Sequence, residues 1–138
     1  MKKFEILLAG CAIADESGLL LLHRNTSDCQ QWELPGGKVA EDETSADAAA
    51  RETLEELGVH VQVGNKLATT LFKQNDQSFA YDIFPAVIIG GEPQVKEPRL
   101  HDKIGRFTLR QLSQMEQLSP NILRLRKLWT DGEIVIGS

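Results

Sequence analysis

Three glutamates, spaced for one face of a helix, are the residues of this chain best suited to do chemistry. Glu52, Glu55 and Glu56 stand at positions i, i+3 and i+4, which project together on a helix with about 3.6 residues per turn. Neighbouring carboxylates repel one another, so this arrangement needs a compensating positive charge. Hard divalent cations such as Mg²⁺ or Mn²⁺ prefer oxygen ligands. The spacing therefore predicts a metal site, with a solvated acidic helix face as the alternative.

The residues around these glutamates favour the metal site. Gly37 opens the stretch, Glu43 lies six residues later, and Arg51 immediately precedes the first of the three acids. Residues 37–59 match the Nudix box, G-x5-E-x7-R-E-U-x-E-E-x-G-U, where U is a bulky apolar residue. The one departure is Thr53, which stands at the first U, keeps the β-branched shape and adds a hydroxyl. On this resemblance the chain is identified as a member of the Nudix hydrolase family.

Composition bounds the class of protein. With 138 residues, of which 41% are hydrophobic, the chain is long enough for one domain with a real core, and 1–138 is expected to form it. A net charge of −5 argues against a surface that binds nucleic-acid polymers, which would need basic patches. No apolar run approaches the roughly 20 residues of a membrane span, so no membrane partner is expected. The sequence does not distinguish a monomer from a homodimer.

The cysteines and the N-terminus bear on the compartment. Cys11 and Cys29 form neither a CxxC pair nor a ligand cluster, which favours reduced thiols in a cytoplasmic protein over a disulfide. Residues 1–3, followed by apolar residues, resemble a signal peptide, but the apolar core before Cys11 is very short and contains Glu5. A buried first strand is the better interpretation, and a cytoplasmic location is expected.

Hydrophobic periodicity and turn residues predict a mixed α/β chain. Thr44 is the expected N-cap and Gly58 the terminator of the box helix, while Ser119 caps a second helix and Asn75-Asp76 forms a turn. Strands and helices in this order suggest a curved mixed sheet with helices on both faces, and the Nudix resemblance implies the same α/β/α sandwich. The expected strands are 3–14, 19–24, 59–63, 66–74, 78–89 and 104–108, the expected helices 45–57 and 120–129, and the expected loop 25–33.

The family resemblance also implies a reaction, the hydrolysis of a nucleoside diphosphate linked to another group. A diphosphate is highly charged, so attack by water needs cations that neutralise the oxygens and activate the nucleophile. Glu52, Glu55 and Glu56 would bind Mg²⁺ or Mn²⁺, and Glu52 or Glu55 would also take the proton of the water. The sequence does not separate the metal ligands from the general base.

Other residues of the box and the loop before it have expected supporting roles. The backbone carbonyl of Gly36 or Gly37 is a candidate metal ligand, and these glycines are expected to let the chain turn tightly. Arg51 is expected to orient a box carboxylate rather than to touch the substrate. Glu43 is expected to begin the helix and to form an ion pair, with a metal role as the alternative.

Outside the box, the chain is most similar to the MutT type of the family, whose members clear oxidised guanine nucleotides from the precursor pool. The resemblance implies that 8-oxo-dGTP is cleaved to the monophosphate and pyrophosphate. The similar segments are the start MKKFEILLAG, WELPGGK at 32–38, GEPQVKE at 91–97 and SPNILRLRKL at 119–128.

The MutT resemblance assigns further residues. Asn121 falls where an asparagine reads the oxidised purine, and an amide offers both a donor and an acceptor to a base edge. The alternative is that Asn121 is only a polar residue of the first helical turn. Glu97 matches an additional carboxylate near the metals, with a solvated loop acid as the alternative, and Arg24 matches an arginine that binds phosphate.

Apolar positions complete the expected nucleotide pocket. Leu34 is expected to contact the nucleotide. Phe79, Tyr81 and Phe84 lie along one predicted strand and are candidates to line a base pocket. Core packing explains Phe79 and Tyr81 equally well.

Other functions remain open. ADP-ribose hydrolases carry a proline, and dinucleoside polyphosphate hydrolases a tyrosine, at set distances beyond the box, where this chain has Asn75 and Asp76. Both subclasses are therefore disfavoured as assignments for this chain. An enzyme that prefers CTP or another nucleotide is the main alternative. A domain that only senses nucleotides is the non-catalytic alternative, but such domains often lose box glutamates and this chain keeps them all.

Overall fold

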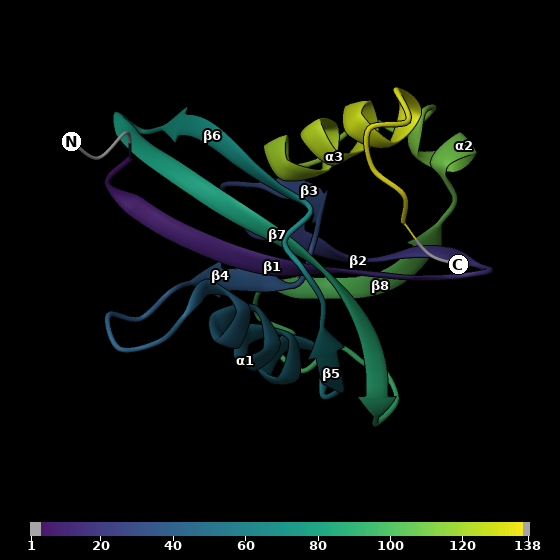
Figure 1. Ribbon diagram of the computed structural model, residues 1–138, viewed down its shortest axis with the longest axis horizontal. Helices are drawn as coiled ribbons and strands as arrows, with labels where there is room; N and C mark the ends of the chain where they lie inside the picture. Colours follow the sequence, from purple (N-terminus) through teal and green to yellow (C-terminus); the bar gives the residue numbers. More distant parts are fainter. Residues whose placement is uncertain (1–3, 137–138) are drawn as a thin grey trace.

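A computed structural model describes residues 4–136 of the chain (Figure 1). The expected first strand, at 3–14, begins one residue outside this range, and residues 1–3 lie outside it altogether. Within residues 4–136, no helix is both long enough and apolar enough to cross a membrane. The helices are α1 (Ser45–Leu57), α2 (Leu109–Leu112) and α3 (Pro120–Thr130). The strands are β1 (Ile6–Asp15), β2 (Gly18–Asn25), β3 (Gln30–Glu33), β4 (Gly36–Lys38), β5 (His60–Val63), β6 (Ala68–Gln74), β7 (Gln77–Gly90) and β8 (His101–Phe107).

The strands form one mixed sheet around a parallel pair. β1 and β7 run parallel, in a register that extends from Ile6 opposite Phe79 to Ile13 opposite Ala86. The remaining pairings are antiparallel: β2 and β4 with β1, β5 and β6 with β7, and β3 and β8 with β2. The expected mixed sheet is confirmed.

Helices cover both faces of this sheet. Figure 1 shows α1 on one side and α2 with α3 on the other. Under α1, Ala48 and Leu57 pack in a core with Phe84 and Leu20. Under α3, Ile122 and Leu125 pack in a second core with Tyr81 and Leu21. The α/β/α sandwich is therefore confirmed, and adjacent residues of the central strands face different cores.

The local start and stop signals of the helices are also confirmed. Thr44 caps α1 by accepting a hydrogen bond from the Asp47 amide at 3.1 Å, and Gly58 ends the helix with φ of 73°. Ser119 caps α3, and Pro120 is its first residue. Because these signals act within a few residues, they can be recognised without knowing the tertiary fold.

The segment expected as a loop, 25–33, is the main correction to the predicted elements. Its second half forms β3, which pairs with β2 from Gln30 opposite Asn25 to Glu33 opposite Leu22. β4 follows directly and pairs with β1. Both strands are short and mostly polar, so neither carries the alternation of apolar residues by which a strand is recognised.

Candidate active site

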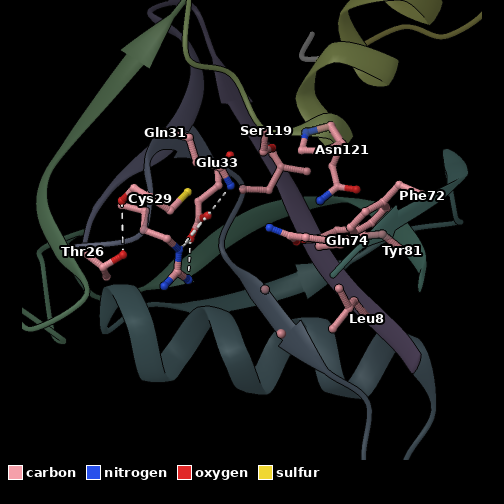
Figure 2. A pocket seen from close by; sticks show the side chains of 15 residues that line it. Leu8, Thr26, Cys29, Gln31, Glu33, Phe72, Gln74, Tyr81, Ser119 and Asn121 are labelled. Atoms are coloured by element: carbon pink, nitrogen blue, oxygen red, sulfur yellow. Dashed lines mark hydrogen bonds and ion pairs between the residues drawn. The ribbon is translucent and has the colours of Figure 1, made fainter. Parts of the chain in front are cut away.

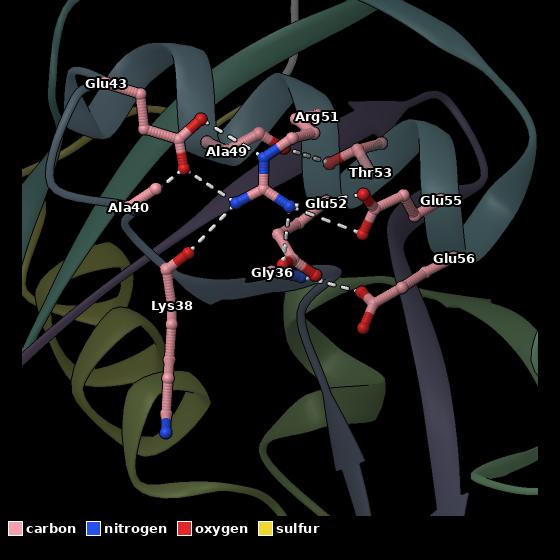
Figure 3. Close-up of polar contacts among 10 residues, drawn as sticks. All are labelled: Gly36, Lys38, Ala40, Glu43, Ala49, Arg51, Glu52, Thr53, Glu55 and Glu56. Carbon is pink, nitrogen blue, oxygen red and sulfur yellow. Dashed lines mark hydrogen bonds and ion pairs between the residues drawn. The ribbon is translucent and has the colours of Figure 1, made fainter.

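The three box glutamates share a face of α1 but differ in exposure. Glu56 is only 5% exposed, and its Oε1 accepts a hydrogen bond from the Gly36 amide at 2.8 Å (Figure 3). The side chain of Glu52 is 18% exposed and that of Glu55 is 52% exposed. The acidic face therefore runs from a buried carboxyl group against β4 to a carboxylate that is open to solvent.

Arg51 joins the acidic face to the segment before the helix. Its Nη1 donates to Glu52 at 3.0 Å and to Glu55 at 3.2 Å, while Nη2 donates to Glu43 at 2.7 Å (Figure 3). Nη2 also donates to the Lys38 carbonyl at 3.0 Å. The hydrogen bonds from Arg51 hold the pKa of Glu43 at about 2. This guanidinium thus contacts three carboxylates of the Nudix box, those of Glu43, Glu52 and Glu55.

Burial changes the protonation of the inner glutamates. It raises the pKa of Glu56 to about 9; the Gly36 amide opposes this rise, and the charges of Glu52, Glu33 and Glu97 add to it. Burial is also the main reason that the pKa of Glu52 is raised. A carboxyl group in such surroundings becomes ionised more easily when a cation is near.

This donor set fits a hard divalent cation in its chemistry. It consists of carboxylate oxygens and the backbone beside Gly37, which are the ligands that Mg²⁺ and Mn²⁺ prefer. Within residues 4–136, no group of three Asp, Glu, His or Cys side chains is arranged so that it could hold one metal ion in this conformation. Arg51 instead holds Glu52 and Glu55 in ion pairs.

Gly36 and Gly37 are required by close packing rather than by a turn. They belong to β4, and neither has a positive φ, which corrects the expected tight turn. A Cβ at Gly36 would lie 2.3 Å from the Tyr81 hydroxyl and 2.4 Å from the Ala9 carbonyl oxygen. A Cβ at Gly37 would lie 2.5 Å from the Glu52 carboxyl carbon. The strand therefore lies directly against the acidic face.

Alanine at the two glycines is expected to have different effects. Gly36→Ala meets backbone and a buried ring, so it should lower the free energy of unfolding by about 1–3 kcal/mol. Gly37→Ala meets only the end of the Glu52 side chain, so the fold should persist while Glu52 is displaced and turnover falls. Thermal melting and kcat of both variants check this. Equal melting temperatures for the two variants would contradict it.

The departure at Thr53 is accommodated inside the helix. Its side chain is fully buried, and its hydroxyl donates to the Ala49 carbonyl at 2.7 Å (Figure 3). A hydroxyl bonded one turn back along its own helix leaves no unpaired polar group in the core. Thr53 therefore supports the helix in place of the bulky apolar residue.

A pocket of about 370 Å³ (Figure 2) is lined in part by β4, the strand that packs against the acidic face. Arg24, Gly36 and Gly37 lie in its lining, and the two glycines contact Glu56 and Glu52 of α1. Leu34, which is 3% exposed, also lines it. The structure thus brings Arg24, Leu34 and the glycine strand together, as the expected nucleotide pocket requires. Lining residues that the sequence did not single out include Glu33, Gln31, Phe72 and Gln74.

Asn121 lies in the same pocket with an unused hydrogen-bond acceptor. It occupies the first turn of α3, is 7% exposed, and faces the pocket beside Phe72 and Tyr81 (Figure 2). Its Oδ1 is buried and has no hydrogen-bond partner among residues 4–136. Buried polar atoms are normally paired, so one that lines a pocket is a candidate ligand contact.

Several expected site residues do not line this pocket, namely Glu52, Glu55 and Glu56 of the acidic face, Glu97 and Phe84. Glu97 does not line the pocket, but its negative charge contributes to the raised pKa of Glu52 and of Glu56. The amide of the neighbouring Lys96 donates to the Glu56 carbonyl at 3.1 Å. Phe84 is a correction, because its side chain belongs to the core under α1. Tyr81, an odd number of residues away on the same strand, faces the pocket instead.

Both cysteines are free thiols with different surroundings. Cys11 is completely buried, and burial raises its pKa to about 11, while a hydrogen bond with Thr53 lowers it. Cys29 is half-buried and lines the pocket. The expectation of two unpaired thiols is confirmed.

Both thiols are expected to be dispensable for turnover. Cys11→Ser should lower the free energy of unfolding by about 1–3 kcal/mol, because it places a hydroxyl in the apolar core. Cys29→Ser should cost little. In the unmodified protein, iodoacetamide at pH 8 should label Cys29 alone, since the Cys11 thiol stays protonated. Loss of turnover in a folded double variant would show that a thiol takes part.

These features define a class of protein: an α/β/α sandwich with a carboxylate-rich helix beside a polar ligand pocket. Residues 7–127 match the NUDIX domain, and the chain belongs to that family. A MutT protein from Methanosarcina mazei Go1 has the same fold, with a TM-score of 0.83 and 22% identity over 98% of this chain and 99% of that one.

Curated relatives are similar over part of their length. A Mycobacterium tuberculosis protein provisionally named 8-oxo-dGTP diphosphatase 2 is 40% identical over 73 residues, which are 50% of each chain. The CTP pyrophosphohydrolase of Escherichia coli K12 is 38% identical over 72 residues, which are 50% of this chain and 51% of the relative. The chain therefore spans about half the length of the curated relatives it matches.

Proposed function

We propose that this protein is a metal-dependent nucleoside triphosphate pyrophosphohydrolase, which converts its substrate and water to a nucleoside monophosphate and pyrophosphate. The preferred substrate is an oxidised purine nucleotide of the 8-oxo-dGTP kind. The observation that carries the proposal is the pocket itself, which joins β4, the strand beside the box glutamates, to Asn121. The buried Oδ1 of Asn121 has no hydrogen-bond partner among residues 4–136. A nucleotide would occupy both ends of this pocket, with its phosphates at the end beside the box glutamates and its base at the end beside Asn121.

At the phosphate end, the acidic face would hold the cation. Glu52, Glu55, Glu56 and Glu97, with the backbone carbonyl of Gly37, are the proposed ligands. Bound there, Mg²⁺ or Mn²⁺ would neutralise phosphate oxygens and lower the pKa of an attacking water. Glu52 or Glu55 is the proposed base that takes the proton of this water.

Arg51 and Arg24 have different proposed roles at this end. Arg51 keeps Glu52 and Glu55 oriented on α1, with Glu43 as its anchor before the helix. Arg24 would bind a phosphate oxygen from the side of the pocket, because a guanidinium suits phosphate geometry.

At the base end, Asn121 would read the purine. Its amide can accept from one group of the base edge and donate to another. Leu34 and the aromatic rings of Phe72 and Tyr81 supply apolar surface around the base. A CTP-preferring enzyme is the second candidate, supported by similarity to the Escherichia coli CTP pyrophosphohydrolase.

A substrate panel tests the proposal. The purified protein would be assayed with Mg²⁺ on 8-oxo-dGTP, dGTP, CTP, ADP-ribose and diadenosine polyphosphates, with EDTA as the control. Pyrophosphate and orthophosphate would be separated, because only pyrophosphate accompanies the proposed cleavage. The highest kcat/KM is expected for 8-oxo-dGTP. A clear preference for CTP would replace the substrate assignment, and orthophosphate as the product would refute the reaction.

A further inference from the structure

A chain of ionisable side chains lies beside the pocket and outside the Nudix box. Glu33 accepts hydrogen bonds from Arg24 Nε on both carboxylate oxygens, each at 3.0 Å, and its Oε1 lies 2.8 Å from Arg24 Nη2. The same Oε1 lies 3.3 Å from His101 Nε2. These residues come from β2, β3 and β8, and Arg24 pairs with both Gln31 and His101 across the sheet. The pairing of β2 with β3 and β8 therefore brings Arg24, Glu33 and His101 together.

His101 is the buried end of this chain. Its side chain is 0% exposed, against 15% for Glu33 and 29% for Arg24. Because a carboxylate only accepts hydrogen bonds, Nε2 of His101 must carry the proton in its contact with Glu33. Nδ1 is buried without a partner among residues 4–136, so this tautomer leaves no N–H group unpaired. Among residues 4–136, the hydrogen bond of the His101 ring is therefore the one that Nε2 donates to Glu33.

Glu33 in turn fixes the arginine that lines the pocket. Its contacts engage Nε and Nη2 of Arg24, which leaves the Nη1 donors for an anionic ligand. Burial alone would raise the pKa of Glu33, but the hydrogen bonds from His101 and Arg24 outweigh it and hold this pKa below its usual range. Glu33 therefore stays charged, and His101 helps to keep it so.

We propose that His101 is a positioning residue of the nucleotide site, which acts through Glu33 to hold the Arg24 guanidinium toward the phosphates. This role rests on the proposed function, in which Arg24 contacts phosphate. His101 itself does not line the pocket. The His101 amide also donates to the Glu97 carbonyl at 3.0 Å, so the turn that carries the proposed metal-side acid also holds the backbone of His101.

The first test is spectroscopic and needs no substrate. The Nε–H resonance of Arg24 would be identified in ¹⁵N spectra by its loss in Arg24→Lys, and its exchange with water measured. Slow exchange is expected in the unchanged protein. In His101→Ala and His101→Asn, exchange should accelerate about tenfold or more, because neither side chain reaches Glu33. His101→Gln, whose amide mimics Nε2, should restore slow exchange.

The matched control is His23→Ala. His23 precedes Arg24 on β2 and also contacts a carboxylate, with Nδ1 at 2.7 Å from Asp102. Within residues 4–136, the hydrogen bonds and ion pairs of the Glu33 side chain are with Arg24, Gln31 and His101, not with His23. Slow exchange of the Arg24 Nε–H should survive in this variant. Fast exchange here, as in His101→Ala, would mean that any loss of packing loosens Arg24, and the proposal would be overturned.

The second test is kinetic, on the best substrate of the panel. His101→Asn should raise KM about tenfold and change kcat less, since a phosphate contact is loosened while the acidic face is intact. His101→Gln should recover most of the loss, and the Mg²⁺ concentration for half-maximal rate should not move. Should His101→Ala fail to fold, the comparison of His101→Asn with His101→Gln still tests the proposal. Equal KM and equal exchange in this pair would refute the role of His101.

The two tests separate this inference from the proposed function. If the unchanged protein hydrolyses no nucleotide, the proposed function fails, whereas the exchange of the Arg24 Nε–H still shows whether His101 positions the guanidinium. If hydrolysis occurs and the exchange is the same in all variants, the proposed function stands and the inference fails.

Discussion

Glu55→Gln and Glu56→Gln are each expected to lose at least about a hundredfold in metal-dependent turnover while they remain folded. Each substitution keeps the shape of the side chain and removes a negative oxygen ligand, so affinity for the cation falls. Turnover would be measured across a titration of Mg²⁺ and of Mn²⁺. Near-normal kcat in both variants at saturating Mg²⁺ would remove the catalytic assignment of the acidic face.

The metal-free Glu56→Gln protein should be more stable than the unchanged protein above about pH 5. In the folded chain the pKa of Glu56 is about 9, whereas the ordinary value is 4.5, so folding disfavours its ionised form. This cost is absent below the ordinary pKa, grows as the pH rises, and reaches about 3 kcal/mol near pH 7. Glutamine has no charge to bury and can accept the same hydrogen bond from Gly36.

Thermal melting in EDTA between pH 5 and pH 9 checks this stability difference. The gap between the two proteins should widen with pH. Glu55→Gln is the control, because Glu55 is half-exposed and its ion pair with Arg51 is worth at most about 1 kcal/mol. If Glu56→Gln lowered the melting temperature as much as a substitution in the hydrophobic core does, the expectation that Glu56 is a neutral carboxyl group in the metal-free protein would be wrong.

Asn121→Ala is expected to reduce kcat/KM for the preferred base about tenfold to a hundredfold. If the Asn121 amide pairs with the base inside the pocket, its removal leaves a buried polar group of the ligand unpaired, at about 1–3 kcal/mol. The acidic face is untouched, so slow turnover of poor substrates should barely change. The assay compares 8-oxo-dGTP with dGTP under identical conditions.

Two controls accompany the Asn121 experiment. Thermal melting shows whether α3 is intact, since Ser119 rather than Asn121 caps this helix. Gln74→Ala changes another amide that lines the pocket, and it tests whether any polar loss has the same effect. An equal drop on both nucleotides, or no drop on either, would mean that Asn121 only serves the helix.

The acidic helix was predictable because its determinants are local. Thr44 and Gly58 cap it within a few residues, and the spacing of Glu52, Glu55 and Glu56 places them together on any regular helix. The ion pair of Arg51 with Glu55, at positions i and i+4, follows from helical spacing, whereas the pair with the adjacent Glu52 does not. The α/β/α layers also follow from the order of strands and helices.

The short strands and much of the pocket could not be predicted, because they depend on remote partners. β3 and β4 exist through pairing with β2 and β1 rather than through their own residues. Glu33 enters the pocket through that pairing, and His101 meets it from β8. Phe84 shows another limit: its aromatic character suggested the pocket, whereas its position an odd number of residues from Tyr81 places it on the opposite face.

The parallel pairing of β1 with β7 has a consequence for how the chain folds as it is synthesised. Partners such as Ile6 and Phe79 are 73 residues apart, and α1 lies between them in the sequence. In a nascent chain all the residues of α1 are therefore synthesised before the central pair of the sheet can close. Closing so long a loop is slow, so folding is expected to be limited by this step. Until β7 is synthesised, the edge of β1 that pairs with it lacks its partner strand.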